Sequence, residues 1–190
     1  YAGARTKTEA EMRKTMHYPL DQARLHPAFG AVDAAMAADG RAHGFTLALA
    51  NRVWPRTGIR MSKLYLETLE KSYGARPVHL DYSGNLEGSR QTINRWVAQK
   101  TLGKIKELLQ KQDLTPGVQV VLTNAIYFKG LWASRFAKTA TRKAPFHLTP
   151  SRTVYVDLMS QTKTLRYTET PDFQAVALPY KGNRLSMIIV

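Results

Sequence analysis

The hydrophobic positions of the first hundred residues recur mostly at the spacing of helices. Thr8 and Glu11 fit a capping box at the start of a short helix. The apolar pattern predicts three further helices, one over 25–39, one that Ser62 caps, and one over 89–100. A glycine suited to a helix C-terminus follows each of these three: Gly40, Gly74 and Gly103.

Strand patterns interrupt these helices. A mostly apolar run predicts a strand over 45–54, a shorter one follows over 77–80, and a long one extends over 118–128. The turn residues Pro116 and Gly117 precede the long run and mark where it begins. The first part of the chain therefore alternates helices and strands.

Beyond Trp132 the pattern changes to strands alone. The segment 139–143 is polar, and we expect it to be extended. Four strands are predicted after it, over 154–159, 165–168, 173–180 and 185–190. Gly182 and Asn183 form a two-residue turn between the last two. Mixed helices and strands followed by strands alone are typical of an α+β fold with more than one sheet, and we interpret residues 1–190 as one domain.

Composition narrows the class of protein. With 190 residues, 44% of them hydrophobic, the chain is long enough for one domain with a core, and it has no cysteine for disulfides or thiolate chemistry. No apolar run approaches the roughly 18 residues that span a bilayer, so we expect no membrane span. The chain begins at Tyr1 and its last apolar pattern stops at Val190, so we expect it to be part of a longer protein.

The net charge of +14 leaves two interpretations open. One is a solvated basic surface, balanced by acidic residues elsewhere in a longer protein. The other is a face that binds a polyanion, either a glycosaminoglycan or a nucleic acid. The basic residues on which both interpretations rest are spread along the second half: Lys100, Lys104, Lys106, Lys111, Lys129, Arg135, Lys138, Arg142 and Lys143.

The sequence contains no catalytic pattern. It has no G-x-S-x-G elbow, and Gly103-Lys104 is followed by Ile105 rather than by the Ser or Thr of a P-loop. The histidines are scattered and fit no metal-ligand spacing: His17, His26, His43, His79 and His147. The acidic residues show no close pair of the kind that glycosidases use. We therefore expect no enzyme activity, no cofactor and no metal.

One polar residue lies near the middle of the long strand predicted over 118–128. Asn124 is an amide within an apolar run, and a buried amide is costly unless it is hydrogen-bonded. We therefore predict that Asn124 is buried and latches this strand to its neighbour. The alternative is an ordinary amide that is satisfied within its own strand.

The run LTNAIYFKGLW over 122–132 resembles the serpins, a family of conformationally labile protease inhibitors. Further serpin-like motifs stand in family order and at family spacing: Ala50–Trp54, Ile93–Val97, Thr101–Ile105, Val156–Gln161, Ala177–Gly182 and Leu185–Ile189. The resemblance implies an incomplete serpin fold with several helices, a large A sheet, and B and C sheets. Residues 118–128 would form the third strand of the A sheet, and the helix over 89–100 would lie across that sheet.

The resemblance also implies roles for single residues. Asn124 and Asn94 correspond to asparagines of the shutter, where the strands are latched, although local hydrogen bonding is the alternative for Asn94. Trp132 corresponds to the breach, where loop insertion begins, and simple core packing is its alternative. The third strand would present its apolar residues to the inserting loop: Val118, Val120, Leu122 and Ile126.

The function that the resemblance implies is inhibition of a serine or cysteine protease. A serpin presents a reactive loop, and cleavage lets this loop insert into the metastable A sheet. That loop and its scissile bond lie outside the 190 residues. A non-inhibitory carrier or chaperone and a polyanion-binding serpin are the alternatives, although 25–39 carries almost no basic residue at the family's usual heparin site. We expect an exported or extracellular protein that is monomeric when complete.

Overall fold

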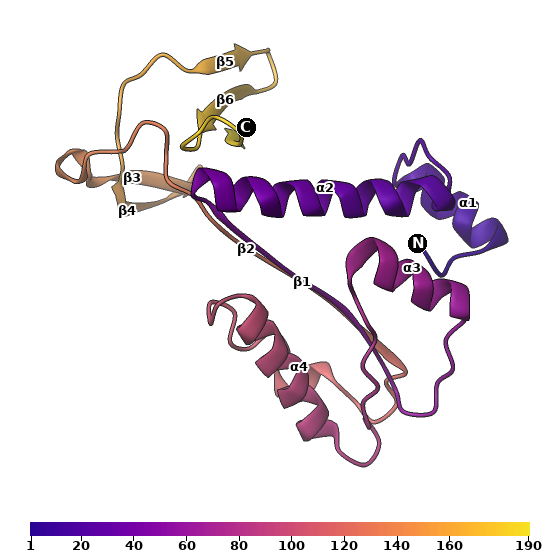
Figure 1. Cartoon of the computed structure of the whole chain (residues 1–190). Helices are drawn as coiled ribbons and strands as arrows, with labels where there is room; N and C mark the ends of the chain where they lie inside the picture. Colours follow the sequence, from indigo (N-terminus) through magenta and orange to yellow (C-terminus); the bar gives the residue numbers. More distant parts are fainter. The chain divides into compact units, whose positions relative to one another are not determined.

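The computed structural model describes residues 1–190, apart from the side chain of Arg41 (Figure 1). The helices, strands and short 3-10 turns follow one another as α1 Thr6–Thr15, α2 Gln22–His43, β1 Thr46–Pro55, α3 Lys63–Tyr73, α4 Leu86–Lys100, η1 Lys111–Asp113, β2 Val120–Lys129, η2 Lys138–Ala140, β3 Arg142–Thr149, β4 Arg152–Leu158, β5 Arg166–Glu169, β6 Gln174–Pro179 and β7 Ser186–Ile189. The strands form three sheets, which confirms the predicted α+β class.

The chain forms two compact units. The first comprises residues 1–40 and 46–128, and the second comprises residues 41–45 and 129–190. Whether the two act as one domain stays a prediction. No helix among the described residues is long and apolar enough to cross a membrane.

The ends of α3 lie where the sequence places them. The Ser62 hydroxyl accepts a hydrogen bond from the Tyr65 N–H at 3.2 Å, and Gly74 takes the left-handed conformation that ends the helix. The predicted i,i+4 pair also forms, with Lys71 Nζ at 3.3 Å from the Glu67 carboxylate. Both ends of this helix are set by side chains or dihedral angles within one turn.

Other helix ends differ from the prediction. The capping box at Thr8 is wrong, because α1 begins at Thr6 and Thr8 lies inside its first turn. The predicted stop at Gly40 is also wrong, since α2 continues to His43 and Gly44, with φ +75°, takes the left-handed position. Helix α4 begins earlier than expected because the Asn85 side chain caps it, accepting from the Gly88 N–H at 3.0 Å.

The first unit is built around the pair of strands β1 and β2, which lie side by side in Figure 1. The Asn51 side chain meets that of Asn124, and the Arg56 N–H donates to the Gln119 carbonyl at 2.8 Å, so the strands run in opposite directions. Helix α4 covers one face of the pair. The core between them contains the buried residues Ala50, Trp54, Tyr82, Ile93, Val97, Leu114 and Ala125. Burial of each large apolar side chain there contributes about 1.5–3 kcal/mol.

The second unit contains two antiparallel sheets. Strands β5, β6 and β7 form one of them, and the turn between β6 and β7 has positive φ at Gly182 and Asn183, which confirms the predicted hairpin. Strands β3 and β4 form the other, with an irregular register between His147 and Thr149.

Two expectations about strands need correction. The polar segment over 139–143 is not simply extended, because η2 occupies its first part and β3 begins at Arg142. Strand β3 was not predicted, and it pairs antiparallel with β4 although Pro145 lies within it. The strand predicted over 77–80 is shorter, with one bridge between Leu80 and Arg56, and its Val78 and Leu80 N–H groups donate to backbone carbonyls of β1.

Candidate functional site in the paired strands of the first unit

Alternate residues of β2 form two faces with different surroundings. Thr123 and Ala125 are only 6% and 4% exposed, because their face packs under α4. The other face presents Val120, Leu122 and Ile126, and Leu122 is 72% exposed. We call this second face, made of Val120, Leu122, Asn124 and Ile126, the open face of β2.

The four apolar residues predicted for the third A-sheet strand do not all lie together. Val120, Leu122 and Ile126 share the open face, whereas Val118 precedes β2 and packs against the core under α4. A strand whose two faces are both apolar is typical of a sheet that is covered on both sides. The composition of the open face therefore fits a surface that further protein covers.

Asn124 lies on the open face and is hydrogen-bonded across the sheet. Its Nδ2 donates to Oδ1 of Asn51 on β1 at 2.5 Å. The expected burial is wrong for this chain, because the side chain is exposed. Breaking a hydrogen bond between two side chains that face water costs little stability, because water replaces the lost partner. The role of Asn124 as a shutter latch stays a prediction.

The buried polar contact between β1 and β2 involves the neighbouring residue Thr123. The Trp54 indole N–H donates to the Thr123 hydroxyl at 3.0 Å, and that hydroxyl donates to the Arg52 carbonyl at 3.3 Å. The Tyr82 hydroxyl donates to the Trp54 carbonyl at 2.9 Å, and burial raises the pKa of Tyr82 to about 12. Sequence reasoning missed this contact, because Thr123 and Trp54 lie 69 positions apart and meet only when β1 and β2 pair.

Arg52 fastens α4 to β1. Its guanidinium carbon lies 4.4 Å from the ring centroid of Trp96 on α4 and 5.3 Å from that of Trp54. The two indole rings meet edge to face, with centroids 5.3 Å apart. Burial lowers the pKa of Arg52, and its Nε is buried without a hydrogen-bond partner among the described residues. Cation–π contacts of this kind are worth about 0.5–2 kcal/mol.

Asn94 is buried on α4, and its hydrogen bonds go to the segment that follows the helix. Its Oδ1 accepts from the N–H groups of Leu108 and Leu109 at 3.0 and 2.9 Å, and its Nδ2 donates to the Leu109 carbonyl at 2.8 Å. These partners lie 14 and 15 positions further along the chain, so the bonds are not local to the helix. A shutter role for Asn94 stays a prediction.

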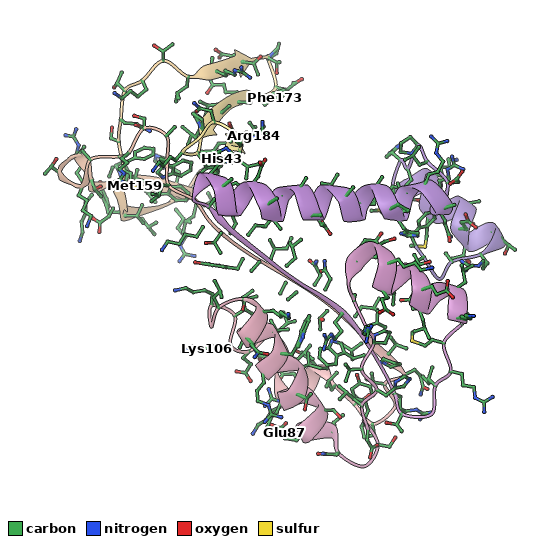
Figure 2. All side chains as sticks on the ribbon, viewed as in Figure 1. His43, Glu87, Lys106, Met159, Phe173 and Arg184 are labelled. Atoms are coloured by element: carbon green, nitrogen blue, oxygen red, sulfur yellow. The ribbon has the colours of Figure 1, made fainter. Side chains whose placement is uncertain are left out.

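Arg90 also holds α4 to the segment that follows the helix. Its guanidinium donates to the carboxylates of Glu87 and Glu107, each at 2.7 Å, and to the Leu109 carbonyl at 2.8 Å. Hydrogen bonds from Arg90 lower the pKa of Glu87 to about 2. Figure 2 shows Glu87 near one end of α4 and Lys106, in the segment after the helix, near the other end. Arg90 and Asn94 thus join the helix to residues 107–109 of the segment that follows it.

Trp132, the predicted breach residue, lies in the second unit. Its ring stacks on that of Tyr180, with centroids 4.6 Å apart and planes at 9°, and Phe136 meets it edge to face at 6.0 Å. Backbone hydrogen bonds from Ala133 to Pro179 and from Lys181 to Leu131 hold the segment against the end of β6. Packing accounts for these contacts, and the role of Trp132 in loop insertion stays a prediction.

The whole sequence, residues 1–190, matches the family model described as serpin (serine protease inhibitor). The chain belongs to the serpin family. It is 36% identical over 190 residues to an uncharacterized serpin-like protein of Thermococcus kodakarensis, covering all of this chain and 44% of that protein. It is 35% identical over 192 residues to the human leukocyte elastase inhibitor, covering all of this chain and 50% of that protein.

The fold is that of a serpin as well. The structure of Arabidopsis AtSerpin1 in its native stressed conformation superposes with a TM-score of 0.86 at 25% identity, covering 96% of this chain and 47% of that one. The serpin chain described here therefore spans about half the length of the curated relatives it matches. The family consists of protease inhibitors rather than enzymes.

The second edge of strand β2 is the feature of this serpin chain best suited to bind further protein. Within the described residues β2 is paired with β1 alone, so its second edge carries backbone N–H and C=O groups without a sheet partner. Such an edge readily accepts another strand. An incoming strand would also meet the apolar side chains of the open face.

Proposed function

We propose that the complete protein inhibits a serine or cysteine protease by inserting its cleaved reactive loop beside β2. The observation that carries the proposal is the free second edge of β2, in a chain that belongs to the serpin family. The reactive loop is not among the 190 residues. The present chain would therefore supply the sheet that receives the loop, and the rest of the protein would supply the loop itself.

The energetics of such an insertion are favourable. Strand β2 has ten residues, and an inserted strand of similar length would gain several backbone hydrogen bonds at about 0.5–1.5 kcal/mol each. Cross-strand pairs with Val120, Leu122 and Ile126 would each add roughly 0.2–1 kcal/mol. The sum is on the order of several kcal/mol, which is large beside the usual net stability of a domain.

The test is to cut the reactive loop of the complete protein and measure melting before and after limited proteolysis. Insertion predicts a rise of ten degrees or more, on the scale of a few degrees per kcal/mol. An ordinary domain loses stability when a loop is cut, because the unfolded chain gains freedom. An unchanged or lower melting temperature would contradict insertion and favour a carrier or chaperone function. A titration with target protease gives the second readout, a stoichiometric covalent complex on a denaturing gel.

A further inference from the structure

Helix α4 and the segment that follows it carry cations that the fold leaves unpaired. Residues 86–114 contain six lysines and arginines and three acidic residues. Arg90 binds the carboxylates of Glu87 and Glu107, and Asp113 accepts a backbone hydrogen bond at 2.8 Å at the start of η1. The other five cations are exposed, and among the described residues none of them is in an ion pair: Arg95, Lys100, Lys104, Lys106 and Lys111.

Two of these cations line one groove between α4 and the segment that follows it. Arg95 comes from the helix, and Lys106 comes from that segment, near one end of α4 in Figure 2. The groove has a volume of about 440 Å³, and its other lining residues are Arg90, Gln91, Asn94, Ala98 and Glu107. A negatively charged chain in this groove would therefore meet cations from both of its sides.

The groove differs from the open face of β2 in what it would cost to cover. Helix α4 buries Ile93 and Val97 against the paired strands, whereas Arg95 is exposed. Of the residues that line the groove, Ala98 alone is apolar. Packing further protein over unpaired cations removes them from water without a compensating partner, whereas covering the open face buries apolar side chains. We therefore expect the groove to stay accessible in the complete protein.

The lining favours a sulfated polysaccharide over a nucleic acid. Sulfate groups only accept hydrogen bonds, and the side chains of Gln91, Arg95 and Lys106 can donate them. No aromatic residue is among those that line the groove, so nothing there would stack on the bases of a single strand. A duplex, whose major groove alone is about 12 Å wide, is too broad to lie in it. A single flexible chain that carries sulfates meets neither obstacle.

We propose that the groove between α4 and the segment that follows it binds a linear sulfated polysaccharide. One sulfate group is held between Arg95 and Lys106, and Lys100 and Lys104, at the end of α4, attract the groups beyond it. Binding at this groove involves neither the free edge of β2 nor a protease. It can therefore be measured, and can fail, independently of loop insertion.

The first test uses the complete protein and a heparin hexasaccharide as the probe, with isothermal titration calorimetry. The double variant Arg95→Gln, Lys106→Gln should weaken binding at least about tenfold, equivalent to about 1.4 kcal/mol. The matched control is Arg142→Gln, Lys143→Gln on β3, because it removes one exposed arginine and one exposed lysine outside the groove and changes the net charge equally. Circular dichroism checks that both variants fold. Absence of saturable binding would overturn the proposal, and so would an equal loss in the two variants.

The second test concerns the class of ligand and the contacts that it makes. An oligothymidylate and a DNA duplex, each of the same total charge as the hexasaccharide, should bind at least about tenfold more weakly than it does. Raising the salt concentration should weaken hexasaccharide binding less in the Arg95→Gln, Lys106→Gln variant than in the unchanged protein, because fewer counterions are released. Equal or tighter binding of either nucleic acid would contradict the assigned ligand. An equal salt dependence would show that Arg95 and Lys106 do not contact it.

Discussion

The two faces of β2 are built from alternating residues of one strand, yet they have opposite surroundings. The face with Thr123 and Ala125 is sealed by α4, whereas Leu122 and Ile126 on the other face are exposed. Both faces are largely apolar, so the strand's own composition does not decide which one is buried. The covered face contributes to the buried core of the first unit, and the open face is where we propose that further protein chain binds.

A substitution on the covered face should destabilise the chain most. Trp54→Ala should lower the free energy of unfolding by about 3–5 kcal/mol, because it removes a fully buried ring and leaves a cavity. Leu122→Ala on the open face should change it by less than about 0.5 kcal/mol in the 190-residue chain. Urea unfolding of both variants measures the difference. Similar effects would mean that the two faces do not differ as described.

A second variant tests the buried contact between the strands. Thr123→Ala should cost about 1–3 kcal/mol, because the Trp54 indole N–H is left buried without an acceptor. Thr123→Ser keeps the hydroxyl and is the control, for which we expect a smaller loss. Chemical denaturation compares the two, and an equal loss in both would show that the threonine methyl group, not the hydrogen bond, is what matters.

The surroundings of Asn124 should differ between the 190-residue chain and the complete protein. In the 190-residue chain the side chain is exposed, so Asn124→Ala should cost less than about 1 kcal/mol. In the complete protein, where we propose that the open face is covered, the same variant should cost about 1–3 kcal/mol and promote polymerisation or spontaneous loop insertion. Melting curves and size-exclusion chromatography of both forms give the answer, and unchanged melting and monomer content in the complete protein would refute the latch role.

The smallest effect concerns the attachment of α4 over the covered face. Hydrogen bonds from Arg90 lower the folded-state pKa of Glu87 to about 2, below the value near 4.5 of a free carboxyl. The stability that Glu87 contributes is therefore present above pH 4.5 and is lost as the pH falls towards 2. Urea midpoints between pH 6 and pH 2 should fall less steeply for Glu87→Gln than for the unchanged chain. Identical profiles would show that the pair contributes nothing measurable.

The site was predicted only in part. Asn124 does have a cross-strand partner, as expected, but the buried polar contact is made by Thr123 and Trp54, which lie 69 positions apart in the sequence. The Asn94 amide, for which two interpretations were open, binds the backbone at 108–109. Each difference depends on which segment packs beside a polar group, and no local pattern in the chain carries that information.

The features that the sequence determined by itself are those that depend on neighbouring residues. Ser62 and Gly74 set the ends of α3, and the pair Gly182-Asn183 sets the β6–β7 turn, because capping and left-handed dihedral angles involve interactions within a few residues. The motif order across the chain also identified the family.

Tertiary structure alone decided the features that depend on distant partners. Strand β3 exists because β4 pairs with it despite Pro145, and α2 passes through Gly40 to end at Gly44. Which face of β2 is buried also depends on a distant partner. Residues 118–128 are apolar on both sides, so only the packing of α4 against one side determines which residues leave water and which remain on the open face.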